Sequence, residues 1–140
     1  MSPLERITQR VHRLGDPDDP DTPRALLSVE EFFDGNDTQG SIGCNLYPRK
    51  PMPEEFRELF AQIARRDNVE DVRVQITAFD DPEWPFTDTV YVMTSATPEE
   101  VMSWFPEDLK PDETWAGFAD QAFEPYEVPA GTQPVACWWD

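Results

Sequence analysis

Between residues 54 and 94 the hydrophobic pattern changes from a helical to a strand period, and this change constrains the fold most. Four apolar residues at helical spacing predict a helix over Glu54–Arg66: Phe56, Leu59, Phe60 and Ile63. Apolar residues then recur at every second position over 72–79, which is typical of a strand with one face on a core. Residues 87–94 are rich in β-branched and aromatic side chains and predict the next strand. The proline-containing turn at 80–86 between them indicates an antiparallel hairpin.

Further elements flank this unit. Residues 41–47 (SIGCNLY) predict a strand, and residues 97–100 (TPEE) predict the start of a second helix, ended by Pro106. Residues 111–117 suggest a helical turn. The segments 122–128 and 135–139 have strand-like composition, and we expect one or both at a sheet edge.

From Ser41 onward the predicted order is strand, helix, strand, strand, helix, strand. This order matches the β-α-β-β-α-β arrangement of ferredoxin-like domains. We therefore expect an α+β fold with an antiparallel or mixed sheet and helices on one face, and a ferredoxin-like core is one arrangement that fits.

The N-terminal part precedes this body. The pattern at Ser2–Glu5, with proline at the first helical position, predicts a helix over residues 1–15. Residues 16–24 contain an acidic, proline-rich linker, and residues 25–140 form the α+β body of one domain spanning 1–140. A second capping pattern at Ser28–Glu31 suggests a short helical turn, with a strand over 26–33 as the alternative.

The chain is strongly acidic, with 11 basic and 29 acidic residues and a net charge of −18. Nucleic acids and anionic membranes are bound through clustered Lys and Arg, so both are disfavoured as partners. A protein with a basic surface is the natural complement, and solubility alone is the alternative explanation. Residues 71–140 carry only 2 basic but 15 acidic side chains, so the charge is lopsided. With no secretory signal or apolar span, we expect a cytoplasmic protein with reduced cysteines.

No motif identifies a catalytic, metal or cofactor site. His12 is the only histidine, and its place beside a linker is typical of a surface residue. Two distant cysteines and one histidine make no zinc ligand set, and no glycine-rich phosphate loop is present. The aspartates of the linker lack the glycine and glutamate that a calcium loop needs. We therefore expect no cofactor and name no catalytic residue.

The strongest candidates are acidic and aromatic residues around the hairpin and the chain end. Carboxylates cluster at the predicted turn, where they would form a partner-binding surface, hold a hard cation or merely be solvated: Asp80, Asp81, Glu83 and Asp88. Trp84 lies among them, and Trp138 and Trp139 lie at the other end of this half. An exposed tryptophan beside carboxylates would be an interface anchor, whereas packing in the core is the more common fate of a tryptophan.

Two segments carry a resemblance. Residues 41–48 (SIGCNLYP) and 104–115 (WFPEDLKPDETW) resemble segments of uncharacterised small acidic bacterial proteins, and this resemblance implies no activity. In size and charge the chain is also similar to immunity proteins that neutralise toxins. Our hypothesis is a non-enzymatic, acidic protein-binding module, with an immunity-type inhibitor of a basic partner as its narrower form. The alternatives are a small carboxylate- or divalent-metal-dependent enzyme and a structural or accessory subunit, such as a homodimer joined through a sheet edge.

Overall fold

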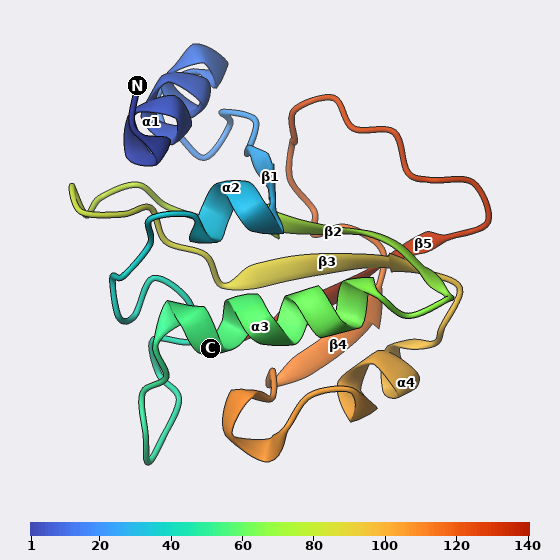
Figure 1. The fold of residues 1–140 in the computed structure, drawn as a ribbon. Coiled ribbons are helices and arrows are strands. Elements are labelled where there is room, and N and C mark those ends of the chain that lie inside the picture. The colour runs from blue at the N-terminus through green and yellow to red at the C-terminus, as the bar shows by residue number, and fades with distance from the viewer.

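Five antiparallel strands form one sheet in the order β1-β2-β3-β5-β4 in the computed structural model, which describes residues 1–140 (Figure 1). The strands are β1 (Leu26–Ser28), β2 (Val69–Gln75), β3 (Thr89–Thr94), β4 (Glu113–Ala116) and β5 (Gln133–Trp138). The α-helices are α1 (Pro3–Leu14), α2 (Val29–Phe33), α3 (Pro53–Ala64) and α4 (Pro98–Ser103), and a 3-10 helix spans Glu107–Leu109. The predicted α+β class is confirmed.

The central helix and hairpin follow the periodicity that predicted them. The apolar stripe of α3 is buried against the sheet, and Val72 of β2 pairs with Val92 of β3 in an antiparallel register. Strand β2 begins and ends earlier than the alternation suggested, at Val69 and at Gln75. All six residues of β3 are buried, which shows that the sheet is covered on both faces.

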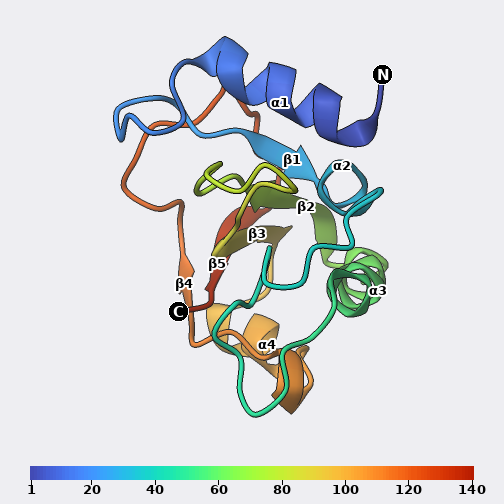
Figure 2. The same ribbon diagram turned by 90° about the vertical axis from the view of Figure 1, so that its left-hand side faces the viewer.

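The helices cover one face of the sheet, as predicted. Side chains from all four α-helices join one core of 25 buried residues, including Ile7 of α1, Phe32 of α2, Phe60 of α3 and Val101 of α4. In Figure 2, α3 lies on one side of the sheet and α1 lies across the end that carries β1. This arrangement places the main core between the helices and one sheet face.

The opposite face is covered by residues 117–132, which we call the covering segment. These residues connect β4 to β5 without forming a strand, and in Figure 2 they run from β4 up to α1. Beneath them is a second, smaller cluster of buried residues: Leu26, Tyr91, Met93 and Ala136. Half-buried aromatic side chains of the segment pack on that cluster, among them Phe118, Phe123 and Tyr126. A segment without regular secondary structure thus covers this face of the sheet, as the helices cover the other.

The N-terminal elements begin where capping predicted. The Ser2 hydroxyl accepts a hydrogen bond from the N–H of Glu5 at 3.1 Å, and α1 begins at Pro3. The two interpretations of residues 26–33 each hold in part, because β1 ends at Ser28 and the same residue caps α2. In this capping box, the Ser28 hydroxyl accepts a hydrogen bond from the N–H of Glu31, and the Glu31 carboxylate accepts one from the N–H of Ser28.

Three expected elements are wrong. Residues 41–47 form turns rather than a strand, because the backbone at Gly43 is left-handed, with φ +64°. Residues 113–116 form β4 rather than a helical turn, because pairing with β5 outweighs the local preference. Residues 122–128 form no strand, although Phe123 makes one parallel bridge with Arg24 just before the edge strand β1. Strand β5 lies inside the sheet, between β3 and β4.

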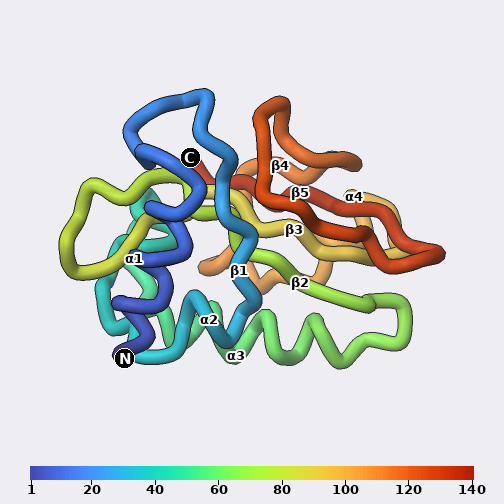
Figure 3. The backbone as a smooth tube through the Cα atoms, turned by 90° about the horizontal axis from the view of Figure 1, so that it is seen from above, coloured from blue at the N-terminus to red at the C-terminus, as the bar shows by residue number.

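The ferredoxin-like arrangement is not confirmed. Its first expected strand, at residues 41–47, is absent, and every neighbouring pair of strands in the sheet is antiparallel. Figure 3, seen from above, shows α3 running along one side of the sheet. None of the helices combines the length and apolar character that a bilayer-spanning segment needs.

Candidate protein-binding surface

The predicted carboxylates around the β2–β3 connection divide into exposed and bonded groups. Three are exposed: Asp80, Asp81 and Glu83. Asp81 accepts a hydrogen bond from the N–H of Glu83 at 2.8 Å, which closes the turn. Asp88 is half-buried, and its carboxylate accepts hydrogen bonds from the hydroxyls of Thr77 and Thr89, both at 2.8 Å. Asp88 therefore holds the base of the hairpin, and the side chains of the other three remain exposed.

Two of the three candidate tryptophans lie in the core, so they are not available as the surface anchors for which they were candidates. The side chain of Trp84 is 5% exposed, and its indole N–H donates to the carbonyl of Phe32 at 2.9 Å. Trp139 is 2% exposed and donates to the carbonyl of Leu109 at 3.0 Å. Its ring packs edge-to-face against three phenylalanines: Phe56, Phe60 and Phe105. Each indole buries a large apolar area and satisfies its one donor.

Trp138 is the candidate tryptophan that stays partly accessible. It is half-buried, and its cross-strand neighbours are Thr89 of β3 and Glu113 of β4. The following residue, Trp139, donates its backbone N–H to the carbonyl of Asp88 at 2.9 Å. The fold thus brings the base of the hairpin and the end of β5 together, and Trp138 and Glu113 lie side by side.

A shallow groove follows β4. It encloses about 500 Å³ and is lined by six residues: Glu99, Met102, Asp112, Glu113, Thr114 and Trp115. Three of these are carboxylates, and Met102 and Trp115 supply apolar surface. The hydroxyl of Thr114 donates to the carbonyl of Pro98 at 3.0 Å, which ties β4 to the start of α4. The groove therefore combines negative charge with apolar walls beside a strand.

A second hollow adjoins the groove through Asp112, which lines both. It encloses about 260 Å³, and its other lining residues are Asn45, Leu46, Tyr47, Trp139 and Asp140. The N–H of Asp140 donates to the carboxylate of Asp112 at 2.8 Å. Tyr47 is 91% exposed, the most exposed of the large apolar side chains. Tyrosine is enriched among the residues that dominate binding energy at protein interfaces, so Tyr47 is a candidate anchor beside these carboxylates.

The groove and its neighbouring hollow carry no internal counter-charge. The protein contains six ion pairs, and none of them involves Glu99, Asp112, Glu113 or Asp140. The paired carboxylates are bonded to Arg10, Arg49, Arg57 or Arg73. After Arg73 the only basic residue in the chain is Lys110. The lopsided charge of the sequence thus becomes an acidic surface around β4.

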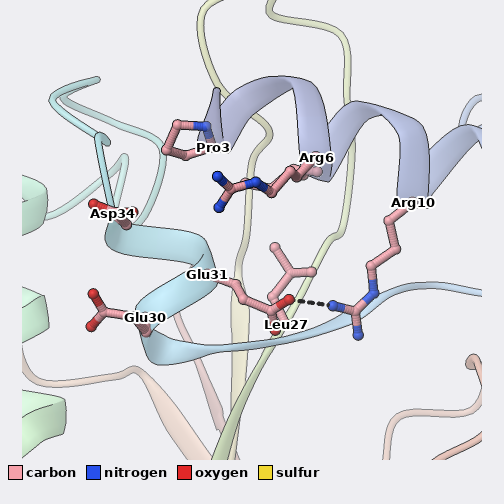
Figure 4. A pocket seen from close by; sticks show the side chains of 8 residues that line it. Pro3, Arg6, Arg10, Leu27, Glu30, Glu31 and Asp34 are labelled. Carbon is pink, nitrogen blue, oxygen red and sulfur yellow. Dashed lines mark hydrogen bonds and ion pairs between the residues drawn. The ribbon is translucent and has the colours of Figure 1, made fainter. Parts of the chain in front are cut away.

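The hollow between α1 and α2 has a different character (Figure 4). It encloses about 150 Å³, and Arg10 of α1 points toward Glu31 of α2 across it. Arg10 bonds the carboxylates of Glu31 at 2.7 Å and Glu124 at 2.6 Å. Its guanidinium also donates to the carbonyl of Leu26 at 3.1 Å. These contacts bind α1 to the body, so this hollow is a structural seam.

The pKa shifts of Arg10 and Glu31 agree with this interpretation. Burial acts to lower the pKa of Arg10, but the hydrogen bond and charge of Glu124, with those of Glu31, outweigh it and raise the pKa. Burial acts to raise the pKa of Glu31, yet the hydrogen bonds from Ser28 and the charge of Arg10 lower that pKa. Both side chains are therefore held in their charged forms, as partners in a structural ion pair.

The histidine, the two cysteines and the acidic side chains are the groups that could take part in metal or cofactor chemistry. No three His, Cys, Asp or Glu side chains come together in a way that could hold a metal ion. His12 is exposed, and its ring lies 6.2 Å from that of Phe79. Cys44 and Cys137 are free thiols, and burial raises the pKa of Cys137. The thiol of Cys137 is therefore held protonated inside the main core.

Sequence reasoning missed the surface around β4 for a local reason. Residues 111–117 had suggested a helical turn, so Asp112 and Glu113 were not assigned to a sheet edge. The one available signal was the scarcity of basic residues after position 71. Tyr47 was missed because residues 41–47 had suggested a strand, which gave no reason to place this side chain beside Asp112.

Comparisons with known proteins agree on one family. The model of a family described as "Uncharacterized protein YfbO family" matches residues 2–137. A relative from Escherichia coli (strain K12), "Uncharacterized protein YfbO", is 52% identical over 141 residues, covering 100% of both chains. No solved structure matches this chain. The expected resemblance to an uncharacterised bacterial family, with no activity attached, is confirmed.

Proposed function

We propose that this chain, which belongs to the YfbO family, is a non-enzymatic module that binds a protein with a basic surface. The observation that carries the proposal is the acidic surface around β4, which no Lys or Arg of the chain neutralises through an ion pair. Like charges gathered without counter-charge repel one another, and a basic partner relieves that repulsion. Complementary fields also accelerate encounter and disfavour wrong partners.

The apolar residues of the same surface support a specific contact rather than general solubility. Tyr47 is exposed beside Asp112, and Trp115 and Met102 line the groove with Glu99. Aromatic anchors surrounded by polar groups are typical of protein interfaces. An immunity-type inhibitor, which would cover a basic toxin, is the narrower form of this proposal, and the cytoplasm is the location we expect.

The test compares two variants with equal loss of charge. The surface variant carries Glu99→Gln, Asp112→Asn, Glu113→Gln and Asp140→Asn. The control variant neutralises four exposed carboxylates on other elements: Glu5, Glu54, Glu58 and Glu70, each changed to Gln. Each protein is immobilised and exposed to extract of the host cell at about 50 mM and about 500 mM NaCl, because surface charges are screened at high salt.

We expect the wild type and the control variant to capture a basic protein at low salt and to lose it at high salt. The surface variant should capture much less of that protein. Recovery of no protein at low salt would overturn the proposal. Equal capture by the two variants would also overturn it, because total charge rather than this surface would then be responsible.

A further inference from the structure

The two edges of the sheet are finished differently. At β1, the outward-facing N–H of Leu26 donates to the carboxylate of Glu124 at 2.7 Å, and its carbonyl accepts from Arg10 at 3.1 Å. The N–H of Ser28 donates to Glu31 at 2.9 Å. Side chains from α1, α2 and the covering segment therefore satisfy the backbone along this edge, and no further strand can pair there.

The other edge, at β4, is open. The N–H of Gly117 donates to the carbonyl of Pro134 at 2.8 Å, in the same register as the β4–β5 pairs. Bonding in an antiparallel ladder alternates along the strand, so Glu113 and Trp115 direct their backbone groups to β5. The N–H and C=O groups of Thr114 and Ala116 consequently point away from the sheet. Neither N–H donates to any turn, loop or side-chain acceptor, and Ala116 is exposed.

The surroundings of this edge select the chemistry of an added strand. The groove beside β4 presents the carboxylates of Glu99, Asp112 and Glu113, and its apolar surface comes from Met102 and Trp115. Side chains of an extended segment alternate between the two faces of a sheet. A segment in which basic and apolar residues alternate would place charges against the carboxylates and apolar groups against Met102 or Trp115.

We propose that β4 binds an extended, basic segment of a partner protein, which joins the sheet as an added antiparallel or parallel strand. Main-chain hydrogen bonds to Thr114 and Ala116 supply part of the affinity, and the acidic groove supplies the preference for Lys and Arg. This inference rests on the proposed function and specifies how the partner is held. A second copy of this chain fits poorly, because it would bring Glu113 and its neighbours against their own negative charge.

The probe for this mode is a fluorescein-labelled peptide of about eight residues, alternating lysine and valine, which matches the length of a short strand. Its affinity is measured by fluorescence anisotropy. The key variant is Ala116→Pro, which removes an outward-facing N–H that β5 does not use, and proline is tolerated at such edge positions. We expect the affinity to fall about tenfold or more.

The matched control is Ala130→Pro, which lies in an exposed turn of the covering segment rather than in β4. The N–H of Thr132 donates to the carbonyl of Pro129 at 3.2 Å, and Gly131 has φ +79°. Proline is favoured at the second position of such a turn, so this variant should fold and bind the peptide like the wild type. A peptide alternating glutamate and valine should not bind.

Amide hydrogen exchange in the wild type gives a second measurement that does not depend on any variant. With the lysine–valine peptide bound, exchange of the Thr114 and Ala116 amides should slow about tenfold or more, as for newly bonded edge amides. Glu113 and Trp115, whose backbone groups face β5, serve as internal references. Unchanged exchange at Thr114 and Ala116 in the bound state would overturn strand addition, even if Ala116→Pro failed to fold.

The outcomes separate this inference from the proposed function. If Ala116→Pro binds the peptide like the wild type while the four-carboxylate surface variant does not, strand addition is wrong and the acidic docking surface stands. If the surface variant binds the peptide like the wild type, the acidic surface itself loses its role. A doubled mass in light scattering without peptide would show that a second copy occupies the edge and would overturn the proposed occupant.

Discussion

The carboxylate of Glu124 accepts a hydrogen bond from the backbone N–H of Leu26 at 2.7 Å, although 98 residues separate the two in the chain. The same carboxylate oxygen accepts from Arg10 at 2.6 Å. Glu124 belongs to the covering segment, Leu26 to β1 and Arg10 to α1. One side chain therefore closes a sheet edge, holds the covering segment on the sheet and binds the N-terminal helix.

Replacing Glu124 with alanine should destabilise the protein by about 2–4 kcal/mol, because it leaves the N–H of Leu26 and the guanidinium of Arg10 without their partner. The side chain of Glu124 is only 15% exposed, so solvent compensates little. The free energy of unfolding is measured by urea denaturation. The control is Glu127→Ala, an exposed position in the same segment, which should change it by less than about 0.5 kcal/mol. Equal effects of the two variants would contradict this role.

The adjacent tryptophans should differ sharply in their contribution to stability. Trp139→Ala removes a core ring and a buried hydrogen bond, so we expect a loss of about 3–5 kcal/mol. Trp138 is half-buried, and Trp138→Ala should cost clearly less, about half as much. Urea denaturation of both variants checks the difference. A larger loss at Trp138 would show that β5 faces the core in the opposite register.

Alanine substitutions at Gly43 and Gly131, which both have a left-handed backbone, should separate the cost of a steric clash from the cost of the backbone conformation. An added Cβ at Gly43 would lie 2.8 Å from Leu46 and 2.9 Å from the ring of Phe56, whereas Gly131 has no atom within 4 Å. Gly131→Ala should cost about 1–2 kcal/mol for the backbone conformation alone. Gly43→Ala should cost about 1–3 kcal/mol more because the core is overpacked. Equal thermal stability of the two variants would argue against the close approach of α3 to this turn.

Alkaline pH should destabilise the protein through two tyrosines beneath or within the covering segment. Burial raises the pKa of Tyr91 to about 12. Burial, together with the hydrogen bond that Tyr126 donates to Asp71, raises the pKa of Tyr126 to about 12. Because both pKa values lie above the ordinary 10.0, the stabilisation is complete below pH 10 and is lost as pH rises toward 12.

The measurement is the free energy of unfolding at about pH 9 and about pH 11, together with the phenolate absorbance of the folded protein. Tyr126→Phe should reduce the pH-dependent loss, because it removes one of the two groups. It should also remove one late step from the phenolate titration. Ionisation of all three tyrosines near pH 10 in the folded protein would contradict the burial of Tyr91 and Tyr126.

The elements that sequence patterns predicted well are those in which local preference and packing agree. The stripe of α3 and the alternation of β2 each report which face meets the core, and capping at Ser2, Ser28 and Thr97 marks three helix starts. In the candidate site, the cluster at Asp80, Asp81 and Glu83 was found as an exposed group, whereas the burial of Trp84 was not. Trp84 lies among acidic residues in the sequence, but its ring faces Phe32, 52 residues away.

Local sequence patterns were enough to predict the four α-helices, the hairpin, the α+β class and the excess of carboxylates after residue 71, because these depend on composition and on periods of a few residues. The order of the strands, the burial of Trp139, the closed edge at β1 and the open edge at β4 emerged only in the folded chain. Those features depend on pairings such as Trp115 with Ala136 and Leu26 with Glu124, which join distant parts of the chain. Long-range pairing overrides local preference where the local signal is weak, and it turned residues 113–116 into the strand that carries the proposed binding surface.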